Sequence, residues 1–125
     1  MVFHHIGIAC QDINLEIEKL KKIHSISNIS DIIFDEYQNV NLCMITLNSG
    51  FKIEFVSGET VKKFINNIAT PYHVCYECIN IDKEIKKISS NGGLLVSGPK
   101  PAKLFNNRKV AFLIVSYGLI ELLEK

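Results

Sequence analysis

The sequence has no excess of charge of one sign and no long hydrophobic run. The formal net charge of its 125 residues is +1, so nothing in the charge favours binding to nucleic acid or to an anionic membrane. No apolar run approaches the roughly 20 residues that a membrane-spanning helix needs. The N-terminus also lacks the basic and then apolar pattern of a signal peptide. We therefore expect a soluble, cytoplasmic protein with no nucleic-acid or membrane partner.

The sequence has four cysteines, and their positions do not predict a disulfide framework. Without an export signal, we expect Cys10, Cys43, Cys75 and Cys78 to be reduced and buried. Cys75 and Cys78 form a C-x-x-C motif, which is typical of redox and zinc sites. They fall, however, in the strand-like run "YHVCYEC", where residues three apart point to opposite faces. We therefore expect both to be packing residues.

The chain contains an internal repeat. A shift of 68 positions takes His5 onto His73 and aligns further identical residues. These are Cys10 and Cys78, Ile13 and Ile81, Glu16 and Glu84, Ile17 and Ile85, and Lys19 and Lys87. The same shift lays "NLCMITL" (41–47) on "KVAFLIV" (109–115), and one residue fewer in the next turn sets Glu54 opposite Glu121. Residues 1–125 are thus predicted to form one α+β domain of two strand–helix–strand–strand–strand (βαβββ) modules, about 3–56 and about 72–124.

Each module has a similar series of expected elements. In the first, a strand at 3–10 precedes a helix capped by Asp12, and residues 25–39 form a loop and an edge strand. A hairpin at 40–47 and 51–56 follows, and 57–71 is a linker with one helical turn. In the second, residues 73–90 form a strand, a polar turn and an amphipathic helix that ends at Gly92 and Gly93. A loop at 97–108 then leads to strands at 109–115 and 119–124.

Each module places a histidine in its first strand and a glutamate in its last. Period-2 alternation puts Ile6 and Ile8 under the helix, so that His5 points to the other face. By the same argument Glu54, His73 and Glu121 point away from the helices. Two packed modules would bring the four side chains to one place, where two imidazoles and two carboxylates suit a divalent metal. The alternative is that the histidines are structural and the glutamates solvent-facing; their repetition at matched positions favours the metal site.

Five landmarks give the sequence a family resemblance. The stretches "HIGIA", "KIEFV", "HVCYE", "VAFL" and "GLIELLE" occur in the order found in the vicinal oxygen chelate superfamily, which the chain resembles over nearly its whole length. The resemblance implies the glyoxalase / dihydroxybiphenyl dioxygenase-like fold, in which βαβββ modules pair within a chain or across a dimer around a metal. The implied ligands are His5, Glu54, His73 and Glu121. The donor types suit Ni²⁺, Co²⁺, Zn²⁺, Mn²⁺ or Fe²⁺.

The stretches "HVCYE", "SGPKP" and "VAFL" are most similar to the methylmalonyl-CoA epimerase and glyoxalase branches. This similarity implies a metal-dependent lyase or isomerase, expected as a homodimer, that abstracts a proton next to a carbonyl of a small carbonyl or thioester substrate. Glu121 is the implied base, and Asp35 or Glu36 is the candidate for the second acidic residue of the epimerase branch. The alternatives are an Fe²⁺ ring-cleaving dioxygenase and a non-catalytic, antibiotic-sequestering protein.

Other polar residues have two interpretations each. Glu77 shares the predicted face of His73 and either orients a ligand or is exposed. In the predicted loop 97–108, the cations Lys100, Lys103 and Arg108 either contact an anionic group of the substrate or are solvated. His4 has Tyr72 at its repeat position instead of a histidine, so we expect a structural role for it.

Overall fold

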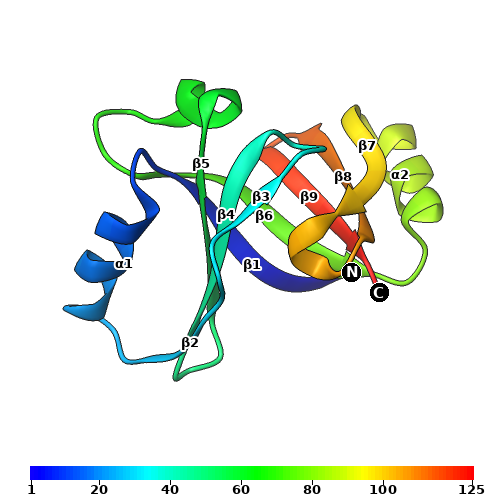
Figure 1. The fold of residues 1–125 in the computed structure, drawn as a ribbon. Coiled ribbons are helices and arrows are strands. Elements are labelled where there is room, and N and C mark those ends of the chain that lie inside the picture. The colour runs from blue at the N-terminus through cyan, green and yellow to red at the C-terminus, as the bar shows by residue number, and fades with distance from the viewer. The chain divides into compact units, whose positions relative to one another are not determined.

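The computed structural model of the protein describes all residues from 1 to 125 (Figure 1). Strands dominate, and the helices are short. In chain order the elements are β1 (Val2–Ala9), α1 (Ile13–Lys21), β2 (Ile26–Ile29), β3 (Ile33–Asp35), β4 (Val40–Leu47), β5 (Lys52–Ser57), η1 (Glu59–Phe64), β6 (Thr70–Cys78), α2 (Ile81–Ser90), β7 (Leu94–Ala102), η2 (Lys103–Phe105), β8 (Arg108–Val115) and β9 (Gly118–Glu124).

The chain divides into two compact units. The N-terminal unit comprises His5–Tyr72, and the C-terminal unit comprises Met1–His4 together with His73–Lys125. The first residues of β1 therefore belong to the C-terminal unit, while the rest of that strand belongs to the N-terminal unit. Each unit contains one α-helix and the strands that follow it.

The two units pair their strands in the same order. In the N-terminal unit the order is β2-β4-β5-β1, with β3 also on β4; β1 and β5 run parallel with Ile6 opposite Ile53. In the C-terminal unit the order is β6-β9-β8-β7; β6 and β9 run parallel with Val74 opposite Ile120. The other pairings are antiparallel. The predicted α+β fold of two βαβββ modules is thus confirmed.

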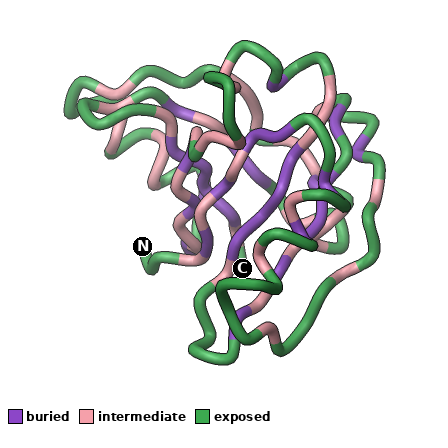
Figure 2. The backbone as a smooth tube through the Cα atoms, turned by 90° about the vertical axis from the view of Figure 1, so that its left-hand side faces the viewer, coloured by how far each residue is buried: buried purple, intermediate pink, exposed green.

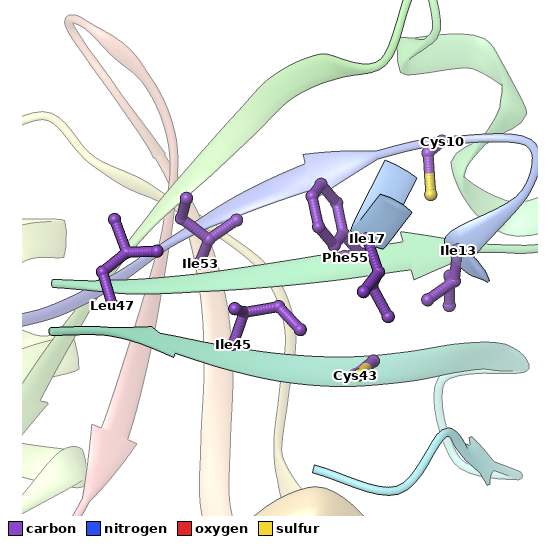
Figure 3. Close-up of a cluster of buried hydrophobic side chains, with 8 residues drawn as sticks. All are labelled: Cys10, Ile13, Ile17, Cys43, Ile45, Leu47, Ile53 and Phe55. Carbon is purple, nitrogen blue, oxygen red and sulfur yellow. The ribbon is translucent and has the colours of Figure 1, made fainter. Parts of the chain in front are cut away.

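Helix α1 covers one face of the N-terminal sheet. It begins at Asp12, whose side chain accepts a hydrogen bond from the backbone N–H of Leu15 at 3.1 Å, as predicted for the cap. Its buried Ile13 and Ile17 pack against β4 and β5, where Ile53 and Phe55 point toward the helix (Figure 3). The members of this core are Cys10, Ile13, Ile17, Cys43, Ile45, Leu47, Ile53 and Phe55.

Helix α2 packs on the C-terminal sheet in the same way. Asn80 accepts a hydrogen bond from Lys83 N–H at 3.0 Å, and Glu124 at the end of β9 accepts one from Ile81 N–H at 2.9 Å. Ile81 is buried in a core with Cys78, Ala111, Leu113, Ile120 and Leu122. Buried residues gather in the strands, and the connecting turns are exposed (Figure 2). With 9 and 10 residues, neither α-helix is long enough to cross a membrane.

One predicted loop is wrong. Residues 97–102 belong to β7, an edge strand that pairs with β8. Its register shifts between Leu95 and Ser97 and again between Ser97 and Lys100, and an edge strand with such bulges tolerates the glycine and prolines of "SGPKP". Between 25 and 39, where one edge strand is expected, the chain forms two short strands, β2 and β3. The expected hairpin of β4 and β5 and the helical turn in the linker are present.

Candidate functional site

In the N-terminal unit, His5 on β1 lies beside Glu54 on β5. Their Nε2 and Oε1 atoms are 3.5 Å apart. The parallel register sets Gly7 opposite Glu54, so His5 lies two positions earlier on the same face of β1. Ile6, Ile53 and the other core residues occupy the opposite face, under α1.

In the C-terminal unit, His73 on β6 lies beside Glu121 on β9. Nε2 of the histidine and Oε1 of the glutamate are 3.4 Å apart. Cys75 is the strand partner of Glu121, so His73 again lies two positions before it on one face. The predicted equivalence of the two modules thus extends to the register of these side chains. Each histidine is paired with the glutamate of its own unit.

All four side chains are buried. The exposed fractions are 0% for His5, 3% for Glu54, 3% for His73 and 2% for Glu121. A buried carboxylate is unfavourable unless a hydrogen-bond donor, a cation or a metal compensates for the lost hydration. In each unit an imidazole nitrogen lies next to the carboxylate oxygen, so both pairs are built of groups that bind borderline divalent metals.

The separations within the pairs fit ligands of a common ion. Imidazole nitrogen and carboxylate oxygen bind metals such as zinc at about 2.0–2.2 Å. Two ligands at these distances lie roughly 3.0–3.5 Å from each other. The His–Glu separations of 3.5 and 3.4 Å meet this requirement, and each pair can therefore supply two adjacent ligands.

Phe112 contributes a contact that the sequence did not single out. It is the strand partner of Glu121, and its ring meets the imidazole of His73 edge-on, with centroids 5.6 Å apart and an interplanar angle of 86°. The contact limits rotation of the imidazole. The hairpin register of "KVAFLIV" with "LIELLE" is the signal that would have identified Phe112.

The structure gives Glu77 a partner other than the candidate ligands. Its Oε2 accepts a hydrogen bond from Nη2 of Arg108 at 2.6 Å, and Nε of Arg108 donates to the carbonyl oxygen of Glu124 at 2.7 Å. The hydrogen bond from Arg108 holds the pKa of Glu77 below its usual value. Arg108 thus links the ends of β6, β8 and β9, and the predicted role in binding an anionic substrate is not supported for it.

Lys100 lies on β7 and Lys103 at the start of η2, instead of in the expected loop. Asp35 and Glu36 differ in their surroundings. Asp35 is buried, and its Oδ1 accepts hydrogen bonds from the backbone N–H groups of Tyr37 at 2.9 Å and Gln38 at 3.2 Å. Because it pairs with Val40 on β4, it lies on the sheet face of Glu54. Glu36 is exposed in the turn.

The remaining predicted residues have packing roles. His4 meets Phe105 edge-on with ring centroids 5.7 Å apart. Cys75 and Cys78 are buried in different clusters, Cys75 with Leu123 and Cys78 with Ile81. Burial raises the pKa of the Cys78 thiol, which disfavours the thiolate that redox chemistry and zinc binding require. The two thiols thus lie in separate clusters, as expected from their spacing on one strand.

Comparison with known proteins identifies a matching family. The family model described as the glyoxalase/bleomycin resistance protein/dioxygenase superfamily matches residues 4–112. A search of the curated proteins finds no match.

Solved structures share the fold. A methylmalonyl-CoA epimerase from Mycobacterium tuberculosis is 17% identical with a TM-score of 0.79, over 98% of this chain and 87% of that one. A Streptomyces coelicolor methylmalonyl-CoA epimerase variant in complex with 2-nitronate-propionyl-CoA is 18% identical with a TM-score of 0.74, over 100% and 97%. A hypothetical protein from Bacillus halodurans is 23% identical with a TM-score of 0.70, over 98% and 93%. At these identities the likeness concerns the fold.

Proposed function

The chain belongs to the glyoxalase/bleomycin resistance protein/dioxygenase superfamily, and from this premise we propose that it is a metal-dependent lyase or isomerase. Its substrate is a small carbonyl compound or a thioester, from which it removes a proton next to the carbonyl group. The observation that carries the proposal is the repeated pair: each unit holds one buried imidazole beside one buried carboxylate at equivalent strand positions.

We propose that the two pairs serve one divalent metal ion, with His5, Glu54, His73 and Glu121 as its ligands. Burial supports this role, because a metal compensates two carboxylates that are otherwise held away from water. Two nitrogen and two oxygen donors suit Ni²⁺, Co²⁺, Zn²⁺, Mn²⁺ or Fe²⁺. When bound, such an ion supplies Lewis acidity that stabilises negative charge on a substrate oxygen.

The residues of the chain then have separate tasks. His5 and His73 remain ligands, and the edge-on contact with Phe112 fixes the ring of His73. Glu121 takes the proton from the carbon next to the carbonyl on its carboxylate oxygen and returns it there or to a neighbouring atom. Delivering the proton to a neighbouring atom gives an isomerase. An epimerase needs a second acid that protonates the opposite face of the same carbon, and Asp35 or Glu36 is the candidate for that role.

The thioester part of the proposal is supported by the fold of the two epimerases, one of which is bound to 2-nitronate-propionyl-CoA. An Fe²⁺ dioxygenase is less well supported, because such sites combine two histidines with a single carboxylate. This chain has a buried carboxylate in each unit.

The test is metal content followed by hydrogen exchange. Protein purified without added metal, or loaded with Co²⁺, Ni²⁺ or Zn²⁺, should hold about one ion per chain and exchange the α-protons of a propionyl thioester with deuterated water. Glu121→Gln should retain the metal through its amide oxygen yet lower the exchange rate about 10²- to 10⁴-fold, since proton transfer contributes that much.

Two controls separate the role of Glu121 from general effects. Exposed Glu59 lies in η1, and Glu59→Gln should exchange at the wild-type rate. Glu54→Gln is the matched change in the other pair and should slow exchange less than Glu121→Gln. Full-rate exchange by Glu121→Gln would show that Glu121 is not the base, and a protein that takes up no metal would contradict the metal-enzyme proposal.

A further inference from the structure

A row of apolar side chains begins at the C-terminal pair and crosses the sheet to its edge. On β9, Leu119 is the strand partner of His73. On β8, Ile114 is the partner of Leu119, and on β7, Leu94 is the partner of Ile114. Directly paired residues share a face of the sheet, so these three side chains lie on the face of His73 and Glu121. We call them the apolar row.

The apolar row is open to solvent, unlike the face under the helix. Ile114 is 47% exposed and Leu94 is 64% exposed, while Leu119 is partly buried. Their neighbours on the other face, Leu113 and Ile120, are buried against α2. Exposed aliphatic side chains that continue from a polar site provide surface that an apolar ligand group can cover.

The corresponding row of the N-terminal unit is polar. Ile53 is the strand partner of Ile6, so Lys52, one residue earlier, lies opposite His5. Lys52 therefore occupies the position that Leu119 occupies opposite His73. Thr46 is the partner of Lys52, and Asn28 is the partner of Thr46. The repeat therefore preserves the two His–Glu pairs but not their surroundings. An apolar row beside only one pair is not required by the module fold and points to a ligand.

We propose that the apolar row binds an alkyl or aryl substituent of the carbonyl substrate, next to the carbon that loses the proton. This inference rests on the proposed function. Strands lie about 4.8 Å apart, so the row extends roughly 14 Å from β6 to β7, which suits a chain of several methylene groups. Three partly exposed side chains offer far less surface area than the roughly 800 Å² that each partner buries in a standard protein interface. The row is therefore assigned to a small molecule.

Binding of three thioesters of N-acetylcysteamine tests the proposal without requiring turnover. The probes are the propionyl, butanoyl and hexanoyl thioesters, and their dissociation constants are measured by titration of the methyl NMR signals of the full-length protein. Full burial of a methylene strengthens binding about fourfold. Because the row is open on one side, we expect the dissociation constant to fall only about twofold for each methylene. The fall from the propionyl to the hexanoyl thioester is then about eightfold, and the Ile114 and Leu119 methyl signals should shift.

Two variants place the polar residues of the N-terminal unit into the apolar row. Ile114→Thr and Leu94→Asn copy Thr46 and Asn28, and each should reduce the eightfold gain in affinity from the propionyl to the hexanoyl thioester to less than threefold. Leu95→Asn is the matched control, because Leu95 is the partner of Leu113 and faces the helix side. Leu95→Asn should retain the eightfold gain in affinity from the propionyl to the hexanoyl thioester.

The outcomes distinguish this proposal from the proposed function. Tighter binding of longer thioesters with no α-proton exchange would leave the apolar row supported and the enzymatic proposal contradicted. Equal affinity for all three thioesters, no binding, or an unchanged gain in both row variants would overturn the assignment. Sedimentation showing that Ile114→Thr or Leu94→Asn dissociates an oligomer would also overturn it, because the row would then be an interface between copies.

Discussion

The ion pair of Glu77 and Arg108 shows how two strand registers in the C-terminal sheet place a charged side chain beside its partner. Glu77 is the partner of Leu123 on β9, and Leu123 is the partner of Val110 on β8, two positions after Arg108. The side chains are 23% and 31% exposed, so solvent screens the pair only in part. Its role is to tie the end of β6, the strand of His73, to β8 and β9.

Glu77→Gln should lower the stability of the protein in a pH-dependent way. The pKa of Glu77 is lowered in the folded protein from 4.5, chiefly by the hydrogen bond from Arg108. A lowered carboxyl pKa stabilises the fold above the unfolded value, and this contribution is lost as the pH falls through the folded value. A partly exposed pair contributes about 0.5–1 kcal/mol. Urea unfolding at pH 7 should show this difference, which should shrink steadily below pH 4.5.

Lys62→Met is the matched control for that measurement. Lys62 pairs with Glu59 at 2.7 Å in an ion pair whose side chains are 63% and 79% exposed. Such a pair contributes little to stability. The free energy of unfolding of Lys62→Met should therefore stay close to wild type both at pH 7 and below pH 4.5. A pH-independent loss in Glu77→Gln would mean that the carboxylate acts through packing rather than through its charge.

The sequence predicted the four candidate ligands but not the environment of Glu77. Period-2 alternation assigns His5, Glu54, His73 and Glu121 to a face with no knowledge of how strands pair. The contact between Glu77 and Arg108 joins positions 31 residues apart and depends on the registers of β6 with β9 and of β9 with β8. That information is absent from local periodicity, and the same holds for the apolar row.

At the scale of single elements, each helix begins with a side-chain cap. Asp12 caps α1 alone, whereas α2 has both Asn80 and the carboxylate of Glu124 at its first turn. Asp12→Ala should therefore lower the free energy of unfolding by about 1 kcal/mol, since it removes the acceptor for Leu15 N–H. Asp12→Asn retains an acceptor and should change the free energy of unfolding by only a few tenths of a kcal/mol. Chemical denaturation followed by circular dichroism measures both.

Glu124→Gln and Asn80→Ala make the corresponding test on α2. Glutamine still accepts a hydrogen bond from Ile81 N–H but loses the negative charge at the helix N-terminus, so a loss of about 0.3–1 kcal/mol is expected. Asn80→Ala should cost about 1 kcal/mol, as Asp12→Ala does. A wild-type value for Asp12→Ala would contradict the assignment of Asp12 as a cap that stabilises α1.

β7 shows where local reasoning about elements fails. The run "SGPKP" contains one glycine and two prolines, which are the usual signals of a loop. In the structure Gly98 has φ +89, and a Cβ there would lie 2.5 Å from the carbonyl oxygen of Val110. The close approach of two backbones across a bulge requires glycine at this position. The glycine and prolines that indicated a loop are thus the residues that allow β7, an irregular edge strand, to pair with β8.

At the scale of the whole molecule, the two units share the geometry of their His–Glu pairs but differ in the residues beside them. The His–Glu separations differ by only 0.1 Å between the units, and the register of histidine with glutamate is the same. Beside the pairs, Lys52 and Thr46 stand where Leu119 and Ile114 stand in the other unit. Under the proposed function, the two matched pairs would bind one ion, and the unequal flanks would orient an asymmetric substrate.

If one ion uses ligands from both modules, its effect on stability must depend on both histidines. A ligand at 100 times its dissociation constant stabilises the folded state by about 2.7 kcal/mol, which for a domain of this size raises Tm by roughly 10 °C. Calorimetry with added Zn²⁺ or Co²⁺ should show this rise at one ion per chain. His5→Gln and His73→Gln should each remove most of it, because either change leaves the other unit's pair without its partner ligands.

Exposed His24 supplies the matched control, and His24→Gln should keep the full rise in Tm. Two independent sites would give a different result: two ions per chain, and about half of the stabilisation retained in each of His5→Gln and His73→Gln. The double variant separates the two cases further. With one shared site, the second substitution adds little to the first, since the interaction energy between the two histidines approaches the whole effect of either. With separate sites, the two losses add.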